Sequence, residues 1–266
     1  MAAFTTLVRR RFALSARTPR EILVPLLTPI LFALVIAPAL GKTMGGDGSG
    51  SGIDYKTFVA IGTIGLLVPI SCMFAGIGVI VDREGGARRD LLAAPISRSL
   101  VVLGNLAVAL TVAAFQLLAL FVAATARGAH FHATASGIGW FGASAVLFAV
   151  AMYGMAETMA NRIPTQEEYV GAVPAVAIVP WFFAGSLFPI KSFPIGLTEV
   201  ARALPLTHAL ALMRYGLVDR NAAGLRDIWG MSNPTVMAGL SLAVVAAFAG
   251  LLTAVSIRAF TRAAVR

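Results

Sequence analysis

The stretch TFVAIGTIGLLVPISCMFAGIGVIVDREGGARRDLLAAP, residues 57–95, joins a long apolar run to a short charged loop. Residues 57–81 carry no charged side chain, and as a helix they would cross a hydrocarbon core about 30 Å thick. The loop from Asp82 to Pro95 then combines charges with a leucine pair and a terminal proline. A loop that only needed to stay solvated would need the charges alone. The pattern predicts a short amphipathic helix at about 83–94, lying at the membrane surface and able to bind a partner.

Five more apolar runs are long enough to cross a membrane, which takes about 20 helical residues. Hydrophobic residues make up 58% of the 266 residues, above the roughly 45–50% of soluble domains, and they fall in blocks. We therefore predict an all-α membrane protein with six transmembrane helices. The predicted spans are residues 22–40, 57–81, 100–126, 138–160, 169–190 and 235–257.

The N-terminus resembles a secretory signal, because Arg9–Arg11 precede an apolar run. That run, at 22–40, is as long as a full span, and more spans follow, so we expect it to be retained as the first span. Before it, Phe4, Leu7 and Phe12 recur at helical spacing. This spacing predicts an interfacial helix along the membrane, with an unstructured basic leader as the alternative.

Basic residues indicate how the chain is oriented. They are concentrated in the leader, in the 82–99 loop and at the C-terminal end, and they are sparse at 41–56 and 127–137. Because positive residues favour the cytoplasmic side, we predict that both termini are cytoplasmic and that the protein lies in the cell (inner) membrane. The same bias accounts for the net charge of +9, so we expect the lipid bilayer, and no nucleic acid, as a partner.

The segment before the last span, residues 191–233, is long and partly apolar. Several prolines in and around it break any continuous helix. Irregular backbone is not tolerated against lipid. We therefore expect two short helices, at about 195–204 and 206–218, that dip into the outer leaflet or pack on the bundle.

Few residues are candidates for chemistry within the chain. Gln116 and Glu157 are the main polar residues inside the spans, and Glu157 is interpreted as a paired or snorkelling interfacial carboxylate, with a transport role as the alternative. The Gly41–Thr43 segment is not a phosphate loop, because Ile36 stands where a Walker A motif needs a glycine. No sequence pattern supplies the three or four ligands of a metal site. We expect no catalytic residue, metal or cofactor in this chain.

Three segments make the chain resemble the ABC-2 type exporter permeases, in particular the small permeases of daunorubicin-resistance and nodulation-factor exporters. One runs from Asp82 to Pro95, where the family has a cytoplasmic coupling helix, although Gly86-Ala87 stands where the family often has Gly-Thr. The others are residues 185–194 and 204–214. The resemblance implies a type V exporter-like fold and an outer gate or re-entrant region. Its residues would be Gly185, Phe188, Pro189, Pro194, Pro205, His208 and Arg214.

The resemblance also implies an exporter built from two permeases and two ATPase subunits. A separate cytosolic ABC ATPase would bind and hydrolyse ATP with Mg, and this chain would pair with a second copy of itself or with a similar permease. The coupling helix would sit in a groove of the ATPase and pass its closure to the spans, and the interfacial helix would add a second contact. The residues assigned to coupling are Arg83, Glu84, Arg88, Arg89, Leu91 and Leu92.

The predicted function is therefore that of an exporter permease for a hydrophobic or amphiphilic molecule, such as an antibiotic or a lipid. Export of a polysaccharide or glycolipid of the cell envelope is the alternative. The spans are mainly aliphatic with Gly and Ala, which favours a drug or lipid over a carbohydrate, since carbohydrate-conducting relatives tend to line the path with aromatics. A membrane enzyme or anchor is least favoured, because no converging set of acids, nucleophiles or metal ligands is visible.

Overall fold

The computed structural model describes residues 2–17, isolated positions between 23 and 39, and residues 53–219 and 221–263. Within these residues every regular element is a helix, as the predicted all-α class requires. Most of the predicted span at 22–40 and the side chain of Leu92 lie outside the described residues. What the sequence predicts for them stays a prediction.

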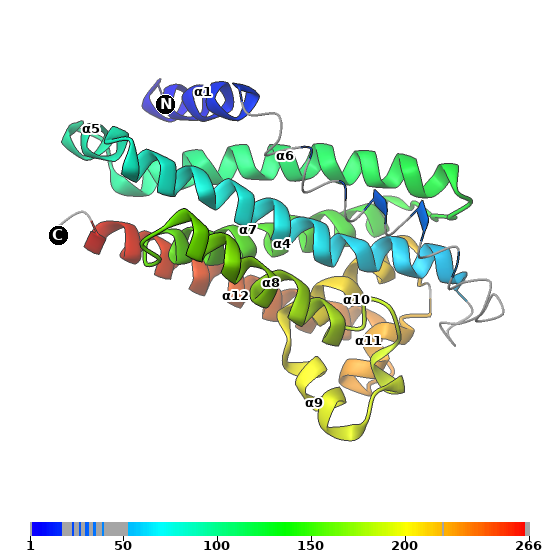
Figure 1. Ribbon diagram of the computed structural model, residues 1–266. Helices are drawn as coiled ribbons and strands as arrows, with labels where there is room; N and C mark the ends of the chain where they lie inside the picture. Colours follow the sequence, from blue (N-terminus) through cyan, green and yellow to red (C-terminus); the bar gives the residue numbers. More distant parts are fainter. Residues whose placement is uncertain are drawn as a thin grey trace.

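Four long apolar helices form the body of the molecule (Figure 1). They are α4 (Tyr55–Glu84), α6 (Arg98–Ala126), α7 (Ala135–Ala160) and α12 (Pro234–Ala263). Each contains one of the predicted spans, and they are the described helices that are long and apolar enough to cross a membrane. The fold is that of a multi-pass helical membrane protein.

The helix α4 occupies the centre of the bundle because it is apolar on all sides. Most of its residues between Tyr55 and Ile80 are buried, as expected for a helix that other helices surround. The helix α7 packs against α4, α12 and α10 (Pro205–Leu217). At Gly154, the backbone of Leu252 comes within 2.8 Å of the point that a Cβ atom would occupy. The helices α7 and α12 therefore touch through their backbones, which only a residue without a side chain permits.

Polar residues fix where several helices begin. Asp54, Thr134 and Thr165 each accept a hydrogen bond from the amide three residues later, at the starts of α4, α7 and α8 (Gln166–Phe183). Asn233 accepts from two amides at the start of α12. These caps satisfy amide groups that have no partner inside the helix.

The helix α8 (Gln166–Phe183) is shorter than the predicted span at 169–190. Its 18 residues make it about 27 Å long, and it is not among the four spanning candidates. It ends where Gly185 takes a φ of 75°, a left-handed conformation that glycine adopts without strain. A short 3₁₀ turn, η2 (Ile190–Ser192), follows. The predicted C-terminal limit of this span is wrong, and the count of six spans stays a prediction.

The predicted coupling helix at 83–94 is also shorter than expected. The helix α4 continues to Glu84, and a separate helix α5 covers only Ala87–Ala93. Gly86, with a φ of 78°, makes the turn between them. Arg83 and Glu84 therefore end the long helix, instead of beginning the short one.

The segment before α12 contains three short helices among the described residues. Two of them, α9 (Ile195–Ala203) and α10, match the two short helices predicted there, and α11 (Ala223–Trp229) was not predicted. Figure 1 shows α9 and α11 away from the end of the bundle where α1 (Ala2–Arg17), α5 and the C-terminal end of α12 lie. The two regions assigned to coupling and to an outer gate are thus separated along the bundle.

Candidate functional site

Arg83 fastens the end of α4 to the connection between α7 and α8. Its guanidinium donates hydrogen bonds to the backbone oxygens of Ala160 at 3.0 Å, Ile163 at 3.1 Å and Pro164 at 2.6 Å. Bonds from a charged donor to backbone carbonyls are stronger than bonds between neutral groups. Arg83 therefore holds its own chain together, and Glu84, next to it, is exposed.

The helix α1, which the sequence predicts to lie along the membrane interface, is bound to α4 through two consecutive arginines. Arg10 forms an ion pair with Asp82, with 2.9 Å between Nη2 and Oδ1. Arg11 is 6% exposed and donates to the backbone oxygen of Ala75 at 2.8 Å. Its guanidinium fills the space beside Gly78, which a side chain at that position would occupy. The predicted α1 is thus a helix, and it is packed onto the coupling end of the bundle.

One face of α5 packs against the C-terminal end of α12. The Arg88 side chain is buried, with its guanidinium carbon 5.1 Å from the centroid of the Phe260 ring. Burial lowers the pKa of Arg88, Arg83 lowers it further, and Glu157 raises it. Leu91 is half-buried beside a cluster that includes Val101 and Phe260.

Charged residues are exposed at the end of α4 and on α5. Glu84 ends α4, Arg89 and Asp90 lie on α5, and we call these three residues the charged docking face. The resemblance assigns Leu91 and Leu92 to coupling with the ATPase. Leu91 instead packs on its own chain, because the apolar side of α5 faces Val101 and Phe260.

Glu157, on α7, is fully buried near this end of the bundle. Its carboxylate accepts a hydrogen bond from the Ser256 hydroxyl of α12 at 3.1 Å. It does not snorkel to the surface. Gln116, the other polar residue predicted inside the spans, is buried on α6 and accepts a hydrogen bond from the Ser71 hydroxyl of α4.

The segment between α8 and α12 is predicted from the sequence to lie on the outer side of the membrane, and we call it the outer region. In it, Arg214 clamps the turn that follows α8. Its guanidinium donates to the backbone oxygens of Gly185 at 2.8 Å and Ser186 at 3.0 Å, and it lies 3.5 Å from the centre of the Phe58 ring. The residue is 6% exposed. Gly185, Pro189 and Arg214 line one cavity of about 30 Å³. That volume suits a water molecule or two and is too small for an exported amphiphile.

His208 joins four helices through a chain of hydrogen bonds. Its Nε2 lies 2.9 Å from the backbone oxygen of Arg202, which can only accept, so Nε2 carries the proton. Burial lowers the pKa of His208, although the bond to Arg202 raises it, so the ring is neutral. Its Nδ1 then accepts from Ser241, at 3.1 Å, and Ser241 accepts from the Trp229 indole at 2.8 Å. His208 is a structural residue here.

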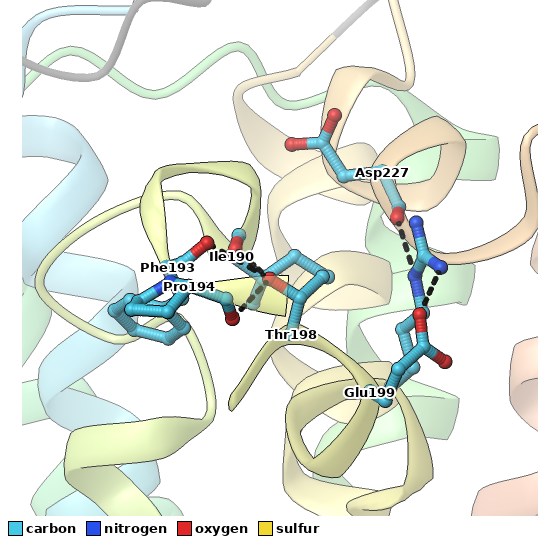
Figure 2. Close-up of polar contacts among 7 residues, drawn as sticks. Ile190, Phe193, Pro194, Thr198, Glu199 and Asp227 are labelled. Carbon is cyan, nitrogen blue, oxygen red and sulfur yellow. Dashed lines mark hydrogen bonds and ion pairs between the residues drawn. The ribbon is translucent and has the colours of Figure 1, made fainter. Parts of the chain in front are cut away.

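The remaining residues assigned to the gate shape the turns of the outer region. The Thr198 hydroxyl lies 3.1–3.2 Å from the backbone carbonyl oxygens of Ile190, Phe193 and Pro194 (Figure 2). It therefore closes the turn at the start of α9. Pro189 precedes η2, Pro205 is the first residue of α10, and Phe188 is half-buried.

Arg202 connects α9 to α11 in the same region. It forms an ion pair with Glu199 at 2.8 Å and donates to the backbone oxygen of Asp227 at 3.2 Å. The predicted gate residues thus do not converge on one point. Gly185, Pro189 and Arg214 meet around the cavity, and His208 and Pro194 support separate contacts.

Reasoning from sequence missed the partners of these residues. At the coupling end, the candidate residues contact Asp82, Ser256 and Phe260. In the outer region, Thr198 and Ser241 make the corresponding contacts. Except for Thr198, whose partners lie four to eight residues away, each is far along the chain from its partner, so no local pattern pairs them. In the described part of the chain, no three His, Cys, Asp or Glu side chains are grouped to hold a metal ion.

Comparison with known proteins places the fold in a family. The model of the ABC-2 type transporter family matches residues 2–218. Nodulation protein J of Rhizobium leguminosarum bv. trifolii is 26% identical over 193 residues, which cover 70% of each chain. The probable multidrug ABC transporter permease YbhR of Escherichia coli (strain K12) is 25% identical over 162 residues, 59% of this chain and 42% of that protein. The chain belongs to the ABC-2 type transporter family.

Proposed function

We propose that this chain is the membrane-spanning permease of an ABC exporter for a hydrophobic or amphiphilic molecule, such as a drug or a lipid. A separate cytosolic ATPase, in two copies, supplies the energy. The chain pairs with a second copy or with a similar permease. The ABC-2 family match over residues 2–218 is the observation that carries the proposal.

The charged docking face supports the position of the ATPase. Arg88 and Leu91 of α5 pack against Phe260 and Val101 of the bundle. A force applied to α5 is therefore passed to the bundle and does not merely bend a loop. Glu84, Arg89 and Asp90 give the exposed side both signs of charge. Charges at the rim of an interface fix its register and its rate of association. The ATPase groove is therefore expected to carry the complementary pattern.

The character of the helices supports an apolar or amphiphilic cargo. On α6, Phe115, Leu118 and Val122 are more than 60% exposed, which suits contact with lipid or with a second permease. The other described spans are mainly aliphatic with Gly and Ala. A multidrug permease is among the similar proteins. We propose that the cargo leaves from the cytoplasm or the inner leaflet of the cell membrane, and that both termini are cytoplasmic.

The test is reconstitution with an ABC ATPase that co-purifies with this chain from its native membrane. The two proteins are purified together in lipid vesicles, and ATP hydrolysis is measured with a panel of amphiphilic drugs, lipids, a glycolipid and a soluble polysaccharide. We expect stimulation and vesicle export with an amphiphilic drug or lipid, and no hydrolysis by this chain alone. Stimulation by the glycolipid or polysaccharide only would overturn the cargo class. Failure of the two proteins to associate would overturn the assignment of the ATPase partner.

A matched pair of variants tests the docking face in the same vesicles. Glu84→Gln removes an exposed charge beside α5, and Glu167→Gln removes an exposed charge from the first turn of α8. We expect Glu84→Gln to lower export by about fivefold at normal expression, which corresponds to roughly 1 kcal/mol of docking energy. Glu167→Gln should leave export unchanged. Equal export by both variants would remove Glu84 from the docking face.

A further inference from the structure

The last turns of α12 present two arginines on the exposed side of the helix. Arg258 and Arg262 are four residues apart, so they lie one turn apart on the same face. Both side chains are exposed, and neither has a hydrogen bond or an ion pair with another residue that the structure describes. Like charges at this spacing repel each other, so the arrangement favours an anion that contacts both.

A third arginine comes from the neighbouring helix. Arg98, the first residue of α6, is exposed and donates to the backbone oxygen of Thr261 on α12, at 3.4 Å. Its guanidinium therefore lies next to the backbone that leads into Arg262. Within the described ranges, no acidic oxygen lies within 4.0 Å of a nitrogen of these three arginines. Two helices thus gather three positive charges at one corner of the bundle without an acidic partner.

The same face of α12 is apolar on the other side of Arg258. Leu251 is 60% exposed and Ala254 is also exposed, and they come seven and four residues before Arg258. Steps of three and four residues keep them on one stripe with the two arginines of α12. The stripe is therefore apolar over its first turns and positively charged at its end.

The stripe matches the profile of a lipid leaflet. The predicted span at 235–257 ends just before Arg258, and the predicted span at 100–126 begins two residues after Arg98. The three arginines thus lie where the headgroups of the predicted cytoplasmic leaflet begin, and Leu251 and Ala254 lie at the depth of the acyl chains. Basic pockets between membrane helices on this side of a bilayer bind anionic head groups. The forked guanidinium of arginine also suits a phosphate group.

The charged docking face has a different composition. There Arg89 is accompanied by Glu84 and Asp90, so both signs of charge are present. A surface of mixed charge suits a protein with a complementary pattern. The arginines at the corner of α6 and α12 have no such acidic companions and continue into an apolar stripe, which suits a lipid better than a protein groove.

We propose that Arg98, Arg258 and Arg262 form a binding site for an anionic phospholipid. The lipid phosphate contacts the three guanidinium groups, and an acyl chain lies along Leu251 and Ala254. The bound lipid fills the corner between α6 and α12 and fixes the depth at which this end of the bundle sits in the bilayer. The inference requires that the helices span a membrane, and it does not depend on export or on an ATPase.

Thermal unfolding of the purified full-length chain in detergent tests the site. Phosphatidylglycerol, phosphatidylcholine and inorganic phosphate are added separately, and the rise of the melting temperature with concentration gives an apparent Kd. We expect phosphatidylglycerol to raise the melting temperature and the other two to have little effect. The double variant Arg258→Gln with Arg262→Gln should weaken the apparent Kd for phosphatidylglycerol by about 25-fold, about fivefold for each arginine near an anionic group.

The matched control removes two other exposed arginines from the same end of the molecule. Arg89→Gln with Arg162→Gln changes α5 and the connection between α7 and α8, and it lowers the net charge by the same amount. We expect this pair to leave the apparent Kd unchanged. All four side chains are exposed, so both double variants should unfold at the wild-type temperature without lipid. Lost binding is thereby separated from lost stability.

Four outcomes would overturn the inference. Wild-type affinity for phosphatidylglycerol in Arg258→Gln with Arg262→Gln would remove these arginines from any lipid site. An equal loss in the control pair would show a dependence on net charge alone. Equal stabilisation by inorganic phosphate would indicate a site for a free anion, and equal stabilisation by phosphatidylcholine would show that the charge of the lipid is not recognised. A chain that binds phosphatidylglycerol as expected but exports nothing with any ATPase would overturn the proposed function and leave this inference standing.

Discussion

Arg10 of α1 and Asp82 at the end of α4 form an ion pair between residues 72 positions apart, with 2.9 Å between Nη2 and Oδ1. The pair attaches α1 to the residue just before Arg83. It therefore joins α1 to the end of α4, which also carries Glu84.

We expect Asp82→Asn to destabilise the protein only slightly. The side chains of Arg10 and Asp82 are 35% and 13% exposed, so solvent screens the attraction. Pairs of this kind contribute up to about 1 kcal/mol, which lowers the melting temperature of a protein this size by about 2–4 °C. Thermal unfolding in detergent measures the change. Arg9→Ala, at an exposed position of α1, is the control and should have no effect; a larger loss for Arg9→Ala would contradict the role given to the pair.

Arg83→Ala should destabilise the protein more than Asp82→Asn. It removes a charged donor from three backbone oxygens, and hydrogen bonds to charged groups are worth about 1.5–3 kcal/mol each. The connection between α7 and α8 should loosen, and limited proteolysis should cut there faster than in the wild type. Cleavage at an unchanged rate would show that the connection is held by other contacts.

The long helices could be predicted from the sequence because length and continuous apolar character decide them. The predicted spans at 57–81, 100–126, 138–160 and 235–257 each fall inside a helix of the structure. The exact residues at which these helices end could not be predicted in the same way, because local backbone geometry decides where a helix stops. Gly86 and Gly185 take positive φ angles, and these turns shorten the coupling helix and α8. A glycine in the sequence permits such a turn but does not require it.

The partners of the candidate residues could not be predicted, because they meet only in the folded chain. Glu157 and Ser256 are 99 residues apart, and Arg88 and Phe260 are 172 apart. The amphipathic pattern around Leu91 identified a helix correctly. The pattern does not show whether the apolar side of the helix faces a partner protein or the same chain. Either contact removes the same apolar surface from water.

Two glycines of α7 should respond to alanine in opposite directions. At Gly154 the new methyl group would meet the backbone of Leu252, which cannot move without moving α12, so we expect a loss of about 1–3 kcal/mol. At Gly142 no atom lies within 4 Å, and replacing a helical glycine by alanine stabilises by roughly 0.5–1 kcal/mol. Thermal unfolding of the two variants compares them directly. Equal changes would mean that α7 and α12 are not in close contact at Gly154.

Arg214→Met should be strongly destabilising, because it removes the clamp of the outer region. Methionine keeps much of the apolar stem but leaves the backbone oxygens of Gly185 and Ser186 buried without their donor. Each buried acceptor left unpaired costs about 1–3 kcal/mol. Lysine cannot replace arginine fully, since one ammonium group lacks the forked geometry that reaches both oxygens. Arg214→Lys should therefore fall between Arg214→Met and the wild type in unfolding measurements.

Arg202→Met is the control for the loss of an arginine in the same region. Its side chain is 42% exposed and its ion pair with Glu199 is screened by water, so the expected loss is below about 1 kcal/mol. The turn between α8 and η2 supplies a second readout, because an unclamped turn should exchange its amide hydrogens faster in Arg214→Met. If Arg202→Met and Arg214→Met lose the same stability, the outer region is held mainly by the apolar packing of α10 and not by the guanidinium.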